Sequence, residues 1–132
     1  SSAITTAFGL GIWQKAAWTN TSSTTCKWTV GNNKITYQSQ NKRNGWFVIS
    51  GNMSCNNANR TISIGIVKNG NSSVRYGETT LRITTGSQPF QFSTVVYVSD
   101  IGPGDYFELY CISSSTGDLL TFQDIQWVAN TQ

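Results

Sequence analysis

Residues 90–112 read FQFSTVVYVSDIGPGDYFELYCI and contain two strand-like runs on either side of a tight turn. In the first run Phe92, Val96 and Val98 share one parity, which is the two-residue period of a half-buried β-strand. The segment Gly102-Pro103-Gly104-Asp105 then supplies turn-forming residues. The stretch therefore predicts two antiparallel strands joined by a short connection.

The same pattern extends along most of the chain. No run of comparable length shows the three-to-four residue period of an amphipathic helix. Residues 72–88 are the least regular part, and they predict short strands within a long loop. A first strand at a sheet edge is expected within Ser1–Ala17. We therefore predict an all-β domain built as an antiparallel β-sandwich. The other predicted strands are Trp46–Cys55, Thr61–Lys68 and Leu119–Ala129, with a hairpin of residues 26–30 and 35–37 around Gly31-Asn32-Asn33.

Length and charge limit the class of protein. A chain of 132 residues fits one domain, so residues 1–132 are read as one sandwich, with residues 1–6 as a linker to an upstream shaft. Charged residues make up 11%, against about 25% in an average soluble domain. The net charge of +3 is scattered, and no apolar run could span a bilayer. We expect neither a nucleic-acid partner nor membrane insertion.

Catalytic chemistry has little support in this composition. The chain contains no histidine, which removes the commonest general base and a leading metal ligand. Its nearest acid pairs, Asp105 with Glu108 and Asp118 with Asp124, fall at turns or along strands, where turn formation or solvation explains them. No acidic run indicates a calcium site. We predict that the protein is not an enzyme and has no catalytic residue, cofactor or metal.

Three cysteines, Cys26, Cys55 and Cys111, make an odd number, so at least one thiol is free or pairs between chains. Cys55 and Cys111 each lie on the apolar parity of a predicted strand. At such positions a cysteine behaves as a small buried hydrophobe, and redox or metal chemistry is the less favoured alternative.

The predicted strand at residues 105–113 is apolar on both sides. One parity carries Phe107 and Leu109, while a second apolar set lies on the other. A strand of a lone antiparallel sandwich usually has one side in water, so the second side is best covered by another subunit. The residues of this second set are Tyr106, Tyr110 and Ile112.

The last run changes parity partway along its length. Leu120 and Phe122 lie on one parity, whereas Ile125 and Trp127 lie on the other. Such a change predicts either a β-bulge or a second buried surface, and the second reading adds Trp127 to the residues expected at a subunit contact.

The order of these segments resembles a known family. A Gly45-Trp46-Phe47 strand precedes an Ile-rich strand ending in Lys68-Asn69-Gly70, and Gly104-Asp105-Tyr106 opens a later strand. This order is similar to the complement C1q-like, tumour-necrosis-factor-like jelly roll, and within it to trimeric heads of phage tail fibres, tailspikes and viral spikes. The resemblance implies jelly-roll topology and a homotrimer, with its interface at Tyr106, Tyr110, Ile112 and Trp127.

Aromatic residues are the strongest candidates for ligand contact. The chain has five tryptophans, and exposed indoles stack on sugar faces while nearby polar groups bond the hydroxyls. The alternative for each is packing in the core or at a subunit contact. A predicted loop adds a charged, stacking and hydrogen-bonding set. The predicted ligand-binding residues are Trp18, Trp28, Trp46, Arg75, Tyr76 and Glu78.

These features together predict a non-enzymatic attachment head of a viral or phage fibre, placed on the virion surface or otherwise extracellular. Its expected partners are its own copies and a host cell-surface saccharide or protein. One alternative is a structural trimerisation cap of a fibre or capsid protein without its own ligand. Others are a secreted C1q/TNF-like ligand domain and a polysaccharide-degrading module.

Overall fold

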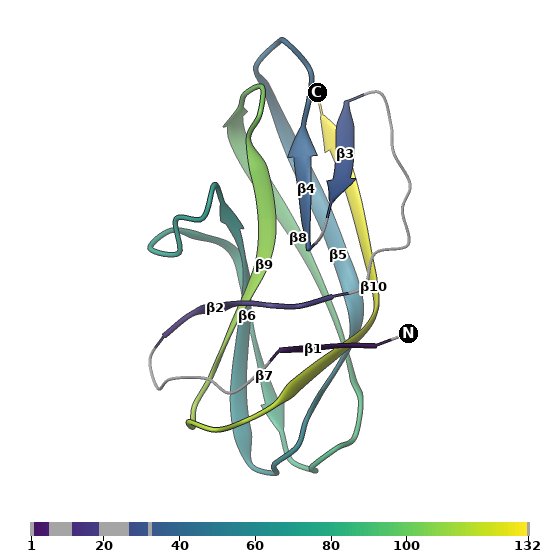
Figure 1. The fold of residues 1–132 in the computed structure, drawn as a ribbon, viewed down its shortest axis with the longest axis vertical. Coiled ribbons are helices and arrows are strands. Elements are labelled where there is room, and N and C mark those ends of the chain that lie inside the picture. Colours follow the sequence, from purple (N-terminus) through teal and green to yellow (C-terminus); the bar gives the residue numbers. More distant parts are fainter. Residues whose placement is uncertain (1, 6–11, 19–26, 32, 132) are drawn as a thin grey trace.

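The computed structural model describes residues 2–5, 12–18, 27–31 and 33–131, and this part of the chain forms strands and no helix (Figure 1). Accordingly, it offers no helix that could cross a membrane. The strands are β1 (Ser2–Thr5), β2 (Gln14–Lys15), β3 (Trp28–Gly31), β4 (Lys34–Tyr37), β5 (Arg43–Cys55), β6 (Arg60–Lys68), β7 (Arg75–Ile83), β8 (Phe90–Ile101), β9 (Tyr106–Ser113) and β10 (Leu120–Thr131).

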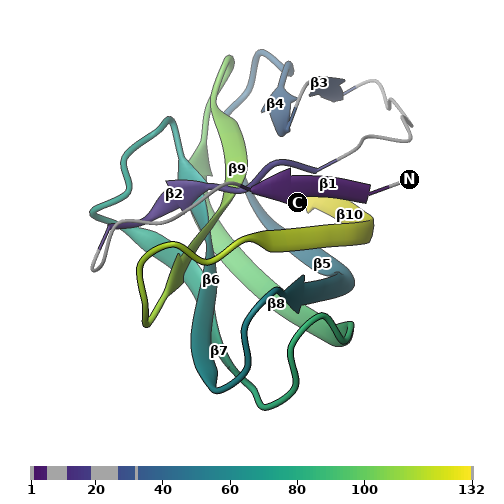
Figure 2. The same ribbon diagram turned by 60° about the horizontal axis from the view of Figure 1, so that its bottom comes forward.

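The strands form two antiparallel sheets packed as a sandwich (Figures 1 and 2). The four-stranded sheet has the order β1-β10-β5-β8, and the six-stranded sheet has the order β3-β4-β9-β6-β7 with β2 paired to β9. From β5 to β6, β7 to β8, β8 to β9 and β9 to β10 the chain crosses between sheets, as in a jelly roll. The predicted all-β sandwich is confirmed. The narrower C1q/TNF-like likeness stays a prediction.

Strand positions follow the sequence pattern closely. The predicted hairpin is present, with Trp28 opposite Tyr37. The five long predicted strands correspond to β5, β6, β8, β9 and β10, and their predicted ends differ from the observed ends by at most three residues. The prediction of short strands in residues 72–88 is wrong, because β7 is one strand of 9 residues. Its irregular pattern comes from a bulge: the pairing with β6 shifts register between Ile64 and Ile66, opposite Gly77, which has φ of 64°.

Inward-facing side chains of both sheets form one core. At its centre the Phe47 ring lies 4.7 Å from Phe107 and 5.4 Å from Trp28, so aromatic residues from β5, β9 and β3 meet across the sandwich. Cys55 and Cys111 are buried and free, which confirms their predicted role as small core residues. Burial raises the pKa of the Cys111 thiol well above its ordinary range, which disfavours the nucleophilic thiolate form. Cys26 lies outside the described residues.

The outward side of β9 is partly covered by the chain itself. Residues 12–18 run alongside β9, where the Ala16 N–H donates to the Leu109 carbonyl oxygen at 2.8 Å. Lys15 Nζ lies 3.2 Å from a carboxylate oxygen of Glu108, which is only 5% exposed although it faces outward. Lys15 thus covers the one carboxylate on this side of β9, whereas the apolar residues of the same side stay partly exposed, and a homotrimer stays a prediction.

The residues predicted at a trimer interface occupy two different places. Tyr106, Tyr110 and Ile112 are half-buried on the outward side of β9, and Lys34 Nζ lies 4.8 Å from the Tyr106 ring centroid. Trp127 instead faces the core, where its ring lies 5.8 Å from Phe47 in an edge-on arrangement. The parity change in β10 thus comes from a bulge, as one of the two readings predicted.

A buried carboxylate joins the β9–β10 connection to the β5–β6 turn and to the ends of β6 and β9. Asp118, in the β9–β10 connection, is fully buried, and its two oxygens share the single N–H of Arg60 Nε at 2.9 and 3.0 Å. Asn57 Nδ2 donates to the same carboxylate at 2.9 Å, and the Ser113 hydroxyl donates at 2.5 Å. Both carboxylate oxygens of Asp118 therefore accept hydrogen bonds, as a buried charge requires. The donors come from the β5–β6 turn, β6 and β9.

Candidate functional site

The outward-facing side of the four-stranded sheet presents its side chains in straight rows. Strands β8, β5 and β10 lie side by side in register over most of their length. Alternate residues of each strand point into the core, so the remaining ones form one surface, called here the outer face. Its rows are Tyr97–Trp46–Asn130, Val95–Val48–Val128, Ser93–Ser50–Gln126 and Gln91–Asn52–Gln123.

The first row carries two exposed aromatic side chains. Trp46 is 38% exposed and Tyr97 is 56% exposed, and the two residues are direct cross-strand partners. Partners of this kind have Cβ atoms about 4.5–5.5 Å apart, so the two side chains leave the sheet from neighbouring positions. Large aromatic side chains on the outer side of a sheet do not contribute to the core, and a contiguous exposed apolar patch is a candidate contact surface.

The second row is apolar. Val95 is 69% exposed and Val128 is 52% exposed, and Val48 lies between them on β5. These three valines and the Trp46–Tyr97 pair together form one continuous surface, called here the apolar half of the outer face. The sequence pattern of β8 gave no reason to expect it, because Val95 and Tyr97 occupy positions that in most antiparallel strands are polar.

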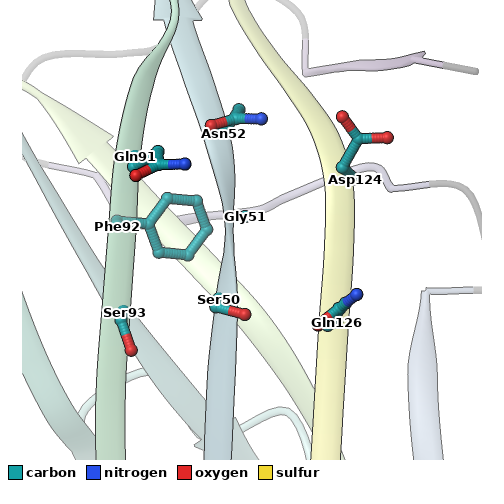
Figure 3. A pocket seen from close by; sticks show the side chains of 8 residues that line it. All are labelled: Ser50, Gly51, Asn52, Gln91, Phe92, Ser93, Asp124 and Gln126. Atoms are coloured by element: carbon teal, nitrogen blue, oxygen red, sulfur yellow. The ribbon is translucent and has the colours of Figure 1, made fainter.

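The other half of the outer face is a polar hollow of about 410 Å³ (Figure 3). Side chains from all three strands surround it, and Phe92 lies beside Gly51 at its floor. Among the described residues, the side-chain amides of Asn52, Gln91 and Gln126 have no protein hydrogen-bond partner. They remain available to a ligand as both donors and acceptors. The lining residues are Ser50, Gly51, Asn52, Gln91, Phe92, Ser93, Asp124 and Gln126.

A bulge in β10 places a carboxylate at the edge of this hollow. The pairing of β10 with β5 shifts register between Gln123 and Gln126, and Asp124 within the bulge has φ of 54°. The bulge turns Ile125 into the core against Gly51, where an added Cβ would lie 2.5 Å from Ile125 Cδ1. Asp124 is left exposed on the outer face, so the bulge converts a sheet position into a polar contact point.

Charged residues gather beyond the opposite end of the outer face. Lys42, Arg43, Asn44 and Asp100 line a second hollow past the aromatic row. Here the Asp100 N–H donates to Asn44 Oδ1 at 3.1 Å, and Asp100 has φ of 57° in a second register shift. Between Asp124 and this end, the four rows of the outer face contain no charged side chain.

Of the predicted ligand-binding residues, only Trp46 lies on the outer face. Trp28 is buried, with its ring 5.1 Å from Tyr37. Trp18 is also buried, and it stacks on Trp127 at 5.8 Å with 25° between the ring planes. These two indoles contribute to packing at one end of the core, and the structure does not bring them together with Trp46 on one surface.

Arg75, Tyr76 and Glu78 come together on β7, in the other sheet. The Arg75 guanidinium donates to Glu78 Oε1 and to the Ser72 carbonyl oxygen, and it lies 4.5 Å from the Trp13 ring centroid. Its charge is therefore already paired and stacked within the molecule. Their role in ligand contact stays a prediction, and the outer face offers the larger set of unpaired groups.

Sequence reasoning missed most of the outer face. Tyr97, Asn52, Gln91, Gln126 and Asp124 belong to three strands separated by long stretches of chain. The signal that could have found them is the strand register, because only the pairing of β8 and β10 with β5 shows that these residues share rows. Among the described residues there is no group of three or more acidic or cysteine side chains placed to hold a metal ion.

Comparison with known proteins gives distant likenesses of fold only. No protein-family model and no curated protein matches the sequence. A solved structure described as "CBM4 structure and function" is 13% identical with a TM-score of 0.49, covering 99% of this chain and 78% of its own. A Bacteroides thetaiotaomicron protein whose proposed role is sugar binding is 11% identical with a TM-score of 0.43, covering 91% and 88%. Likenesses this distant carry no information about ligand or chemistry.

Proposed function

We propose that this protein is a non-enzymatic saccharide-binding module that binds its ligand on the outer face of the four-stranded sheet. The observation that carries the proposal is the exposed Trp46–Tyr97 pair, held in register with rows of unpaired amide and hydroxyl side chains. Sugar rings have apolar C–H faces and polar edges. A rigid sheet that offers aromatic rings beside amides matches both.

The outer face stands on a hydrogen-bonded sheet. Strand β5 is hydrogen-bonded to β10 on one side and to β8 on the other. Every outer-face side chain therefore belongs to one of three paired strands. Such a surface is ordered before the ligand arrives, so little conformational entropy is lost on binding. The hollow is open and shallow, and modest affinity for a single site is expected.

The positions of the carboxylates oppose a hydrolytic function. Asp124 and Asp100 are the exposed acids at the two ends of the outer face, next to Asn52 and beyond Trp46 respectively. At about 3.3 Å per residue these ends lie roughly 20 Å apart, whereas a glycosidase pair is separated by about 5–9.5 Å. This separation supports a binding role for the outer face over a hydrolytic one.

Removing the aromatic row is expected to weaken saccharide binding strongly. We expect Trp46→Ala and Tyr97→Ala each to cost about 2 kcal/mol, or roughly thirtyfold in Kd, because each removes one of the two aromatic stacking surfaces of the site. Glycan-array binding followed by calorimetry measures this. Val74→Ala, an exposed change in the β6–β7 loop, is the matched control and should bind as wild type. Equal binding by all four proteins would contradict the proposal.

A narrower proposal is that the module is the trimeric attachment head of a viral or phage fibre, exposed on the virion. It is supported by the low charged fraction of 11% and by the half-buried aromatic residues Tyr106 and Tyr110 on the outward side of β9. Three copies would raise the strength of attachment through multivalency. Light scattering at micromolar concentration tests it, and a stable monomer would refute the trimer while leaving saccharide binding intact.

A further inference from the structure

The outer face is long and narrow, and its length runs along the strands. From the Trp46 row to the Asn52 row the chain advances six residues along β5, which corresponds to roughly 20 Å at about 3.3 Å per residue. Across three strands at about 4.8 Å spacing, the width is roughly 10 Å. A surface of these proportions accommodates a chain of several sugar units laid parallel to the strands, and a single unit would contact one row or two.

The rows also differ in what they can bond. The valine row of Val95, Val48 and Val128 has no side-chain donor or acceptor, and it separates the aromatic row from the amides of the polar hollow. A saccharide that bears only hydroxyls would lose hydrogen bonds to water over this row and gain none. A methyl-bearing substituent would instead bury apolar surface there.

Charge narrows the ligand class further. The four rows carry no Lys or Arg to pair with a ligand carboxylate or sulfate, and Asp124 would repel an anionic group at the polar end. Asn52, Gln91 and Gln126 each offer one amide oxygen and one amide NH₂ to the ligand. Acetamido groups combine an amide of matching polarity with a methyl group for the valine row.

We propose that the ligand is an uncharged, acetamido-bearing oligosaccharide of several units that lies along the strands, with an acetyl methyl group against the valine row. This inference rests on the proposed function and specifies the ligand of the same site. It makes two claims that saccharide binding alone does not require: affinity increases with chain length beyond a disaccharide, and the acetyl group is recognised by valine side chains.

Calorimetric titration of the whole protein with two matched tetramers tests both claims. Chitotetraose and cellotetraose share one backbone and differ in the acetamido or hydroxyl group on each ring. We expect chitotetraose to bind about tenfold more tightly, since one buried methyl contributes roughly fourfold and the amide adds hydrogen bonds. Chitobiose should bind at least about tenfold more weakly than chitotetraose, because it spans only part of the face.

The valine row is tested with Val95→Thr combined with Val128→Thr. Threonine keeps the shape and β-branching of valine, and its added hydroxyl faces water at these exposed positions, so the fold is retained. The preference for chitotetraose should fall to about two- to threefold, with the affinity for cellotetraose nearly unchanged. Trp46→Ala is the control and should weaken both tetramers in parallel, because the two ligands share the same ring faces for stacking.

The outcomes separate this inference from the function on which it rests. Equal affinity for the two tetramers, equal affinity for dimer and tetramer, or a preference that survives the double threonine variant overturns the inference. Binding of neither tetramer also overturns it, and saccharide binding then stands if another array glycan is bound and lost in Trp46→Ala. If no array glycan is bound, the proposed function fails as well.

Discussion

Asp118→Ala is expected to lower the free energy of unfolding by about 3–5 kcal/mol, the range for removing one partner of a buried ion pair. The carboxylate is fully buried, and its loss leaves Arg60, Asn57 and Ser113 without the acceptor that joins the β5–β6 turn to the β9–β10 connection. Urea unfolding followed by tryptophan fluorescence measures the change. Asp118→Asn should also be strongly destabilising, because the asparagine is neutral and no longer balances the Arg60 charge.

Asp124→Asn provides the matched control, since it makes the same chemical change at an exposed bulge where asparagine also tolerates positive φ. It should alter stability by no more than about 0.5 kcal/mol. If Asp118→Asn and Asp124→Asn proved equally mild, the network around Asp118 would not contribute to stability as the geometry indicates.

The same carboxylate should make stability depend on pH. Burial alone would raise the pKa of Asp118, but hydrogen bonds from Ser113, Asn57 and Arg60, together with the Arg60 charge, outweigh it and hold the pKa below its ordinary value. A lowered folded-state pKa gives stability that is present above the unfolded value of about 3.9 and is lost as pH falls through the folded value. The stability gap between wild type and Asp118→Asn should therefore narrow below about pH 4. A gap that stayed constant in acid would contradict this pKa direction.

Gly77→Ala is expected to destabilise the protein by about 2–5 kcal/mol. Its φ of 64° costs an L-residue about 1–2 kcal/mol, and overpacking costs about 1–3 kcal/mol more. The steric part arises because an added Cβ would lie 2.2 Å from Val96 Cγ2, a branched side chain on β8 in the facing sheet. Thermal unfolding of the variant and wild type measures the sum.

Gly104→Ala separates the two contributions. Gly104 also has positive φ, 84°, but an added Cβ there meets nothing within 4 Å. This variant should show only the conformational cost of about 1–2 kcal/mol. Should Gly77→Ala be no worse than Gly104→Ala, the close approach of β7 to β8 would have to relax without cost.

Local pattern was sufficient to predict the strands, because side chains alternate between core and solvent with a period of two. Phe92, Val96 and Val98 face the core as their spacing predicts, and the parity change before Ile125 marked a real bulge. The pattern failed at β7, where a bulge at Gly77 breaks the alternation although pairing with β6 continues.

The candidate site was predicted only in part. Sequence identified Trp46 as a contact residue but grouped it with Trp18 and Trp28, which the structure buries. An indole is large and apolar enough for either role, so its residue type does not decide between core and surface. The strand register decides it, because Trp46 lies on the outward parity of β5 opposite Tyr97.

By itself the sequence determined the all-β class, the positions of the long strands and the burial of Cys55 and Cys111, since these depend on the identity of neighbours a few residues away. Only the tertiary structure decided that β8, β5 and β10 share one face, and that β2 pairs with β9. Both depend on contacts between segments far apart in the chain. Such contacts are set by the packing of the two sheets as a whole, and no local period encodes them.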